Sequence, residues 1–261
     1  MGRKIDLTPR PLACLPDGWR RACRVVLNDR EAESPSDLWW EYATKAPPPS
    51  PDDCDSYVLA TLLPAMKRGA NIRVHGSVSR GLLANLEELQ HVWAKWCPDL
   101  YSRISIEVET VREHERAVEG AVAAFSGGVD AQFTAYRHAK GLAGYAGQSL
   151  RAGVFVHGFD IPLDDEDGFS RAAEKANLVL SDIGLDLILV RTNIREFWGD
   201  NWEHYSGTAL VSVLNGLKVH AGVGLVGSGG SYDALVVPWG SHPIPDALSG
   251  SGDFGIIHDG A

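Results

Sequence analysis

Short apolar segments alternate with segments of helical periodicity throughout the second half of the chain. The apolar segments are rich in Val, Ile, Leu and Ala, and they cover residues 120–125, 152–158, 185–193, 223–230 and 254–260. Apolar residues recur at helical spacing in the segments between them, at 129–141, 169–184 and 202–222. This alternation is typical of a parallel sheet covered by helices on both faces. We therefore expect a doubly wound, five-stranded parallel α/β domain of the Rossmann-like class over residues 118–261.

The first part of the chain has a different pattern. The proline-rich segment KAPPPSPDD at 45–53 is incompatible with a helix or a central strand, so we expect an exposed loop there. The pattern around it predicts helices and strands, with helices at 55–69 and 79–96 and strands at 21–28, 37–43, 71–76 and 102–111. We expect a small α+β accessory region over residues 1–115 that gives substrate specificity. The segment 112–120 would connect it to the second domain.

Composition limits the classes of protein to which the chain can belong. Its net charge of −10 disfavours a nucleic-acid partner, because nucleic-acid binders usually carry an excess of basic residues. No apolar run approaches the roughly 18–20 residues that cross a bilayer, and the N-terminus lacks the apolar segment of a secretory signal. The four cysteines are widely spaced and form no C-x-x-C pair. We expect a reduced, cytoplasmic protein without a zinc site.

The strand at 120–125 runs directly into Ser-Gly-Gly-Val-Asp at 126–130, and a helical segment follows. Glycines allow a tight turn and a close approach to a ligand, and the first amides of a helix attract an anion. The loop lacks the lysine of a Walker A motif and the three glycines of a Rossmann fingerprint. It resembles the PP-loop of the ATP pyrophosphatase superfamily, whose pattern is S-G-G-x-D-S. This family has a HUP-type α/β fold and includes asparagine, GMP and NAD synthetases, tRNA thiolation enzymes and cyano-deazaguanine synthases.

The resemblance, which covers about residues 118–259, implies how this loop would hold a nucleotide. The Ser126 hydroxyl and the amides of Gly127, Gly128 and Val129 would bind the β- and γ-phosphates of ATP. Asp130 would orient the loop or hold Mg²⁺ beside the pyrophosphate. The chain departs from the pattern at Ala131, where the family has serine. That departure removes one hydroxyl aimed at pyrophosphate, which either weakens binding or marks a degenerate, non-catalytic member.

Other loops at the carboxyl ends of the expected strands complete the predicted site. Adenine would lie against the second strand end, ribose against the third and the α-phosphate against the second glycine-rich loop, which assigns Val156, His157, Gly158, Thr192, Gly227, Ser228, Gly229 and Asp233 to the site. Asp130 and Asp233 are the expected catalytic and Mg²⁺-binding carboxylates. A structural histidine at 157, a packing role for Thr192 and a plain turn at 227–233 are the alternatives. The cations that neutralise pyrophosphate are expected among Arg137, Lys140, Arg171, Arg195 and Lys218.

The resemblance implies cleavage of ATP between its α- and β-phosphates. A substrate oxygen would attack the α-phosphorus, giving an adenylated intermediate and pyrophosphate, and a nitrogen or sulfur nucleophile would then displace AMP. We expect a ligase acting on a small molecule or peptide, with a non-catalytic nucleotide-binding module as the alternative. The chain ends directly after the fifth expected strand. Either a homodimer mate or another partner covers that sheet edge, or the chain is a truncated form of a longer protein.

Overall fold

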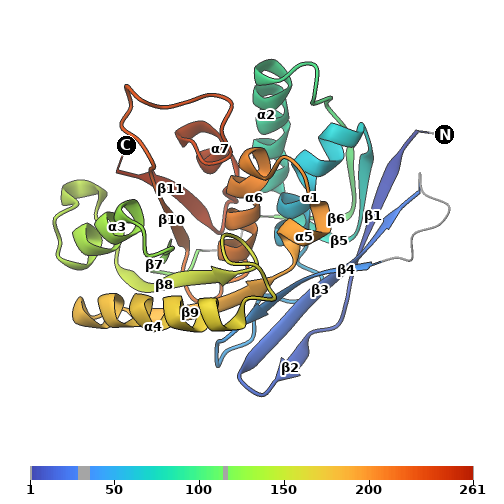
Figure 1. The fold of residues 1–261 in the computed structure, drawn as a ribbon. Coiled ribbons are helices and arrows are strands. Elements are labelled where there is room, and N and C mark those ends of the chain that lie inside the picture. Colours follow the sequence, from blue (N-terminus) through green and yellow to red (C-terminus); the bar gives the residue numbers. More distant parts are fainter. Residues whose placement is uncertain (1, 29–35, 114–116, 261) are drawn as a thin grey trace.

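The strands of the protein form one mixed sheet that continues through both halves of the chain (Figure 1). The computed structural model describes residues 2–28, 36–113 and 117–260. The strand order is β11-β10-β7-β8-β9-β4-β3-β1-β5-β6, and β2 pairs with β3. In chain order the strands are β1 (Lys4–Pro9), β2 (Ala13–Leu15), β3 (Gly18–Leu27), β4 (Ser36–Tyr42), β5 (Asn71–Ser79), β6 (Ile106–Arg112), β7 (Ala121–Ala124), β8 (Leu150–His157), β9 (Asp186–Thr192), β10 (Val223–Gly227) and β11 (Gly255–Asp259).

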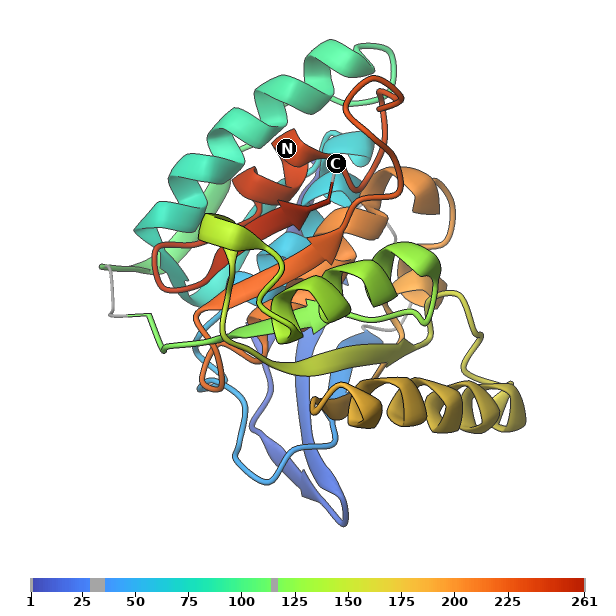
Figure 2. The same ribbon diagram turned by 90° about the vertical axis from the view of Figure 1, so that its left-hand side faces the viewer.

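Helices cover both faces of this sheet. The helices are α1 (Asp55–Arg68), α2 (Arg80–Trp96), α3 (Val129–Ala139), α4 (Glu166–Asp182), α5 (Ile194–Trp198), α6 (Trp202–Asn215) and α7 (Pro243–Leu248), with a 3-10 turn at Gly144–Ala146. Figures 1 and 2 show α3 and α4 near β8, with α2 at the opposite end of the molecule from α4. None of the helices within the described ranges is long and apolar enough to cross a membrane.

The predicted α/β class is confirmed, and the strands of the second half pair in parallel. Each neighbouring pair among β11, β10, β7, β8 and β9 is parallel. Val122 of β7 joins the large hydrophobic core with α6, whereas Phe125, just past the strand, packs on Ala131 and Ala135 of α3. Successive side chains of a strand point to opposite faces, so an almost continuously apolar strand is buried on both sides.

The five parallel strands are not a separate sheet. Strand β4 pairs antiparallel with β9, with Trp40 opposite Thr192, and joins the parallel strands to those of the first half. Helix α1 is buried along almost its whole length and packs against α6. One hydrophobic core therefore includes residues from both halves. The domain boundary near residue 115 stays a prediction, and part of the expected connection, 114–116, lies outside the described residues.

Several short elements were not predicted from the sequence. Helices α5 and α7 have five and six residues, too few to show helical periodicity, and β2 has three. Helix α7 packs against both β11 and α2, close to the end of the chain. The helix expected at 202–222 ends at Asn215. Gly216 follows, and a side chain there would collide with the Tyr42 ring.

A buried ion network joins four segments of the chain. The Lys218 ammonium lies 2.5 Å from Asp53 and 3.2 Å from both Asp55 and Asp253. Arg112 contacts the same three carboxylates at 2.9 to 3.3 Å. Burial raises the pKa of Asp55, and the neighbouring Asp53 raises it further, while Lys218 and Arg112 oppose that shift. The three carboxylates therefore depend on the two cations to remain charged in the interior.

Replacing the buried ammonium tests this dependence. In Lys218→Met, three buried carboxylates keep only Arg112 as a counter-ion, and removal of one partner from a buried ion pair costs about 3–5 kcal/mol. We expect the free energy of unfolding, measured by urea titration, to fall by that amount. Lys67→Met is the matched control, because Lys67 pairs with Asp200 at the surface and such pairs contribute at most about 1 kcal/mol. Equal losses in the two variants would contradict the structural importance of the network.

Candidate functional site

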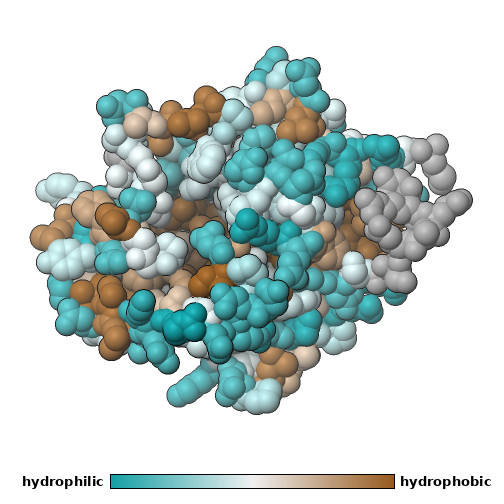
Figure 3. All heavy atoms as spheres, in the orientation of Figure 1, coloured by the Kyte–Doolittle hydropathy of each residue, from teal (hydrophilic) through white to brown (hydrophobic). Residues whose placement is uncertain are grey.

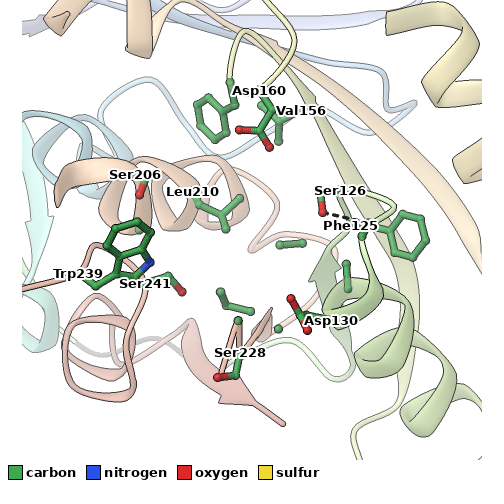
Figure 4. A pocket seen from close by; sticks show the side chains of 18 of the residues that line it. Phe125, Ser126, Asp130, Val156, Asp160, Ser206, Leu210, Ser228, Trp239 and Ser241 are labelled. Carbon is green, nitrogen blue, oxygen red and sulfur yellow. Dashed lines mark hydrogen bonds between the residues drawn. The ribbon is translucent and has the colours of Figure 1, made fainter. Parts of the chain in front are cut away.

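A cavity of about 730 Å³ lies at the carboxyl ends of β7, β8 and β10. Its remaining walls come from α6 and from the loop between β10 and α7 (Figure 4). From β7 the chain proceeds through β8 to β9 on one side, and then returns to place β10 on the other side of β7. In open parallel sheets, the point where the strand order reverses leaves a crevice that binds ligands. The cavity lies at that point.

The glycine loop turns the chain from β7 into α3 at one side of this cavity. Gly127 has a φ of 80°, in the left-handed region, whereas Gly128 is extended with a φ of −71° and caps the helix. The Gly128 amide donates to Ser126 Oγ at 3.3 Å, and Gln132 Nε2 donates to the Gly127 carbonyl at 2.6 Å. No side chain caps the N-terminus of α3. Its first amides are therefore available to a ligand.

Two further contacts fix α3 beside the second glycine-rich loop. Asp259 of β11 is buried and accepts hydrogen bonds from Thr134 Oγ1 at 2.9 Å and from His138 Nε2 at 3.2 Å. Its carbonyl accepts a hydrogen bond from the Ser228 amide. A Cβ at Gly227 would lie only 3.0 Å from the Asp130 carbonyl, so this close approach requires glycine. The two glycine loops consequently meet at the mouth of the cavity.

The structure brings together more than half of the residues that the sequence assigned to a site. The cavity is lined by residues from both glycine loops and from the end of β8, which are Ser126, Gly128, Asp130, Ala131, Val156, Gly227, Ser228 and Gly229. Gly127 and Val129 belong to the first loop but do not line the cavity, and the Val129 side chain faces solvent. Figure 4 shows Ser126, Asp130 and Ser228 around one part of the cavity.

Four predicted residues lie outside the cavity lining and have other contacts. His157 is buried, donates from Nε2 to the Pro162 carbonyl at 2.7 Å and stacks on Phe169. Thr192 donates its hydroxyl to the Trp39 carbonyl at 2.7 Å, between β9 and β4. Gly158 has a φ of 100° and donates its amide to Ile161. Asp233 is exposed, and a hydrogen bond from Ser231 lowers its pKa.

Three carboxylates line the cavity, from Asp130, Asp160 and Glu203, while no lysine or arginine of the described chain does. Figure 4 shows the Asp160 side chain turned into the cavity beside Val156. The cations predicted to neutralise phosphate have other partners: Lys218 belongs to the ion network, Arg137 lies 3.7 Å from Asp259, and Arg195 donates to the Phe159 carbonyl. Arg171 and Lys140 are likewise not among the lining residues. Backbone amides and hydroxyl groups are therefore among the lining groups available to an anion.

Sequence reasoning missed Asp160, Glu203, Ser206, Trp239 and Ser241, which also line the cavity. His242, which the sequence offered as a metal ligand or a structural histidine, lines it as well. Asp160 follows Phe159 in the loop after β8, and Glu203 follows Trp202, the first residue of α6. Their positions directly after aromatic residues are the signal that could have indicated them. Phe159 and Trp202 pack with ring centroids 4.8 Å apart, which brings Asp160 and Glu203 to one side of the cavity. The others depend on how the loop at 228–242 folds back over α6.

The buried aspartates of the ion network form a second group with the spacing of metal ligands. Asp53, Asp55 and Asp253 each have an oxygen within 4.8 Å of the others. The Lys218 ammonium already contacts all three carboxylates, however, so it takes the position of a bound cation. We therefore assign these three aspartates a role in stabilising the fold.

Comparisons of the chain with protein-family models, with curated proteins and with solved structures found no match. The candidate site therefore depends on its own geometry.

The different backbone conformations of the two loop glycines can be tested separately. Gly127→Ala places a Cβ on a residue in the left-handed region, which costs about 1–2 kcal/mol, although no heavy atom lies within 4 Å of that position. The backbone at Gly128 is extended, and the Cβ that Gly128→Ala adds would lie 3.4 Å from its nearest neighbour, Ser126 Oγ. We expect urea titration to show a loss of that size for Gly127→Ala and a smaller loss for Gly128→Ala, because alanine is a poorer N-cap than glycine. The reverse order would contradict this loop conformation.

Proposed function

We propose that the protein binds ATP with Mg²⁺ at the glycine loop and cleaves it between the α- and β-phosphates, as a PP-loop enzyme of the HUP class. The observation that carries the proposal is the position of Ser126–Asp130. The loop joins a central parallel strand to a helix at the point of strand-order reversal, and it opens onto the cavity. The relative order of β7 to β11 places the first strand in the centre, which agrees with this class.

The phosphates would bind at the uncapped N-terminus of α3. The amides of the first turn of α3 have no side-chain cap, and the partial positive charge there favours an anion. The Ser126 hydroxyl and the amides of the second glycine loop lie close by. Backbone donors suit this task, because they need no side chain to be reoriented when the ligand enters.

The carboxylates suit Mg²⁺ and disfavour a nucleotide without it. Asp130 lines the cavity beside the glycine loop, and oxygen ligands are those that Mg²⁺ prefers. Asp233 is exposed and does not line the cavity, so Asp130 is the stronger candidate of the two predicted ligands. When bound, Mg²⁺ would neutralise phosphate charge that no lining cation of the described residues balances. We therefore expect ATP affinity to depend strongly on the divalent ion.

The opposite part of the cavity suits adenosine. Val156, Phe159 and Ile161 give it an apolar wall at the end of β8, with Phe155 behind them. Purine rings bind well to aromatic and aliphatic surfaces that carry a few polar groups. Asp160 is placed to accept a hydrogen bond from an amino group on that side of the cavity.

A substrate oxygen attacking the α-phosphorus would release pyrophosphate and form an adenylate, and a nitrogen or sulfur nucleophile would then displace AMP. The chain would promote this chiefly by positioning and by its amide dipoles. A non-catalytic nucleotide-binding module is the alternative, and one observation favours it. Ala131 lies in an apolar cluster with Phe125 and Leu180, where the related pattern has a serine.

Blocking the space in front of α3 tests nucleotide binding. A Cβ at Gly128 meets no backbone atom, so Gly128→Val should fold normally while its branched side chain occupies the space that phosphate needs. We expect calorimetric titration with MgATP to show at least about 100-fold weaker binding. Gly255→Val at the start of β11 is the control, since a Cβ there also has no neighbour within 4 Å. Parent-like affinity in Gly128→Val would overturn the proposal.

The products of ATP cleavage separate an enzyme from a binding module. We expect incubation with α-labelled ATP, Mg²⁺ and pools of carboxylic acids and amines to give AMP and pyrophosphate, with Asp130→Asn reducing the rate more than Asp233→Asn. ADP and phosphate as products would contradict cleavage at the α-phosphate. Tight binding without turnover in every pool would favour the non-catalytic alternative.

A further inference from the structure

The wall of the cavity contains a buried chain of hydrogen bonds that nucleotide binding does not use. Ser241 lines the cavity, and its hydroxyl donates to Asp246 Oδ2 at 2.9 Å. His258 Nδ1 lies 2.6 Å from the same oxygen. The Asp246 side chain is fully buried and that of His258 is 4% exposed. Of these three hydrogen-bonded residues, Ser241 is thus the one that lines the cavity (Figure 4).

The hydrogen bonds among Ser241, Asp246 and His258 indicate which atoms donate and which accept. His258 Nε2 and Asp246 Oδ1 are buried and have no hydrogen-bond partner within the described residues. Because a carboxylate oxygen accepts, the proton of the hydrogen bond between His258 and Asp246 is on His258 Nδ1. Asp246 is then a carboxylate that accepts from the serine and from the histidine. Burial raises the pKa of Asp246, while the hydrogen bond from His258 lowers it. A buried carboxylate with a raised proton affinity is a suitable base.

His242 supplies a donor beside the serine. Its Nδ1 accepts from the Ile244 amide at 3.2 Å, so the neutral ring carries its proton on Nε2. Burial lowers the pKa of His242, and the neighbouring His258 lowers it further. His242 lines the cavity directly after Ser241 in the chain. A neutral imidazole N–H at this position can stabilise negative charge that develops on an oxygen near the serine.

The other serines of the cavity have no such base. Ser126 Oγ accepts from an amide, and Ser228 donates to the Gly230 carbonyl at 2.6 Å. Ser206 has no carboxylate partner within the described residues. Ser241 is therefore distinguished from three serines that share the same cavity by its hydrogen bond to a carboxylate.

We propose that Ser241 is a nucleophile that accepts an acyl or phosphoryl group from a substrate held in the cavity, with Asp246 as its base and His258 positioning Asp246. Ser241 Oγ forms a bond to the carbonyl carbon or phosphorus, the bond to the leaving group breaks, and that group departs with the bonding electrons. The serine proton passes to Asp246 Oδ2. Water then attacks the carbon or phosphorus and the bond to Oγ breaks. Oγ recovers its proton from Asp246, and the proton that the attacking water loses passes to solvent, where it balances the departed leaving group. This reaction consumes no ATP.

An alkyl fluorophosphonate tests the proposal without knowledge of the substrate. Attack by Ser241 forms an Oγ–P bond, releases fluoride and transfers the serine proton to Asp246. We expect mass spectrometry of the full-length protein, digested after labelling, to place the phosphonate on Ser241 at least about 100-fold faster than on Ser206 or Ser228. Asp246→Asn should slow labelling by about 100-fold or more, and Ser102→Ala, at an exposed position outside the cavity lining, should leave its rate unchanged.

Two further measurements make the result decisive. Circular dichroism shows whether Asp246→Asn folds, and His258→Gln provides a second variant that retains the carboxylate. We expect His258→Gln to slow labelling at least about tenfold while the fold is kept. An unlabelled Ser241 in the wild-type protein, or equal labelling of the cavity serines, would overturn the proposal. All reactions run without nucleotide, so a failure of ATP binding cannot produce either result.

Discussion

The buried ion network around Lys218 is the constraint on which the arrangement of the site depends. Its members come from the segment before α1, the end of β6, the turn after α6 and the loop before β11. A charge in the interior is tolerated only beside its counter-ions, so these four segments cannot move apart independently. Asp55 also accepts a hydrogen bond from the Ser79 amide at the start of α2. The network thereby joins the two halves that the change in sequence pattern separates.

The character of the cavity follows from the sheet. Reversal of the strand order around β7 opens the crevice, and the apolar strand ends line it. Polar side chains come from the loops, from Asp130 at the start of α3 and from α6. Those loops contribute carboxylates, hydroxyls and amides and, within the described chain, no lysine or arginine. The groups of these loops that an anion could contact are therefore amides and hydroxyls.

Most of the parallel half could be predicted because its strands are buried on both faces and its helices are long enough to show a period. The glycine loop was equally visible, since only glycine allows the φ of Gly127 and the close approach at Gly227. The continuity of the sheet through β4 could not be predicted, because it depends on Trp40 pairing with Thr192 across 152 positions of sequence. His157 and Thr192 were assigned to a site by their place at strand ends, but their polar atoms bind backbone carbonyls.

The loop that carries Ser241 shows how stability and chemistry are connected. Gly207 of α6 and Gly240 of the loop pack so closely that a Cβ on either would collide with the other segment. This contact sets where Trp239 and Ser241 enter the cavity, while the hydrogen bond to Asp246 sets the direction of the serine hydroxyl. Helix α6 is in turn held at its C-terminal end by Lys218, three residues beyond Asn215. Loosening the ion network should therefore alter the cavity wall before it unfolds the sheet. Helix α6 is the element that connects the two, because it contributes to the cavity wall and ends next to Lys218.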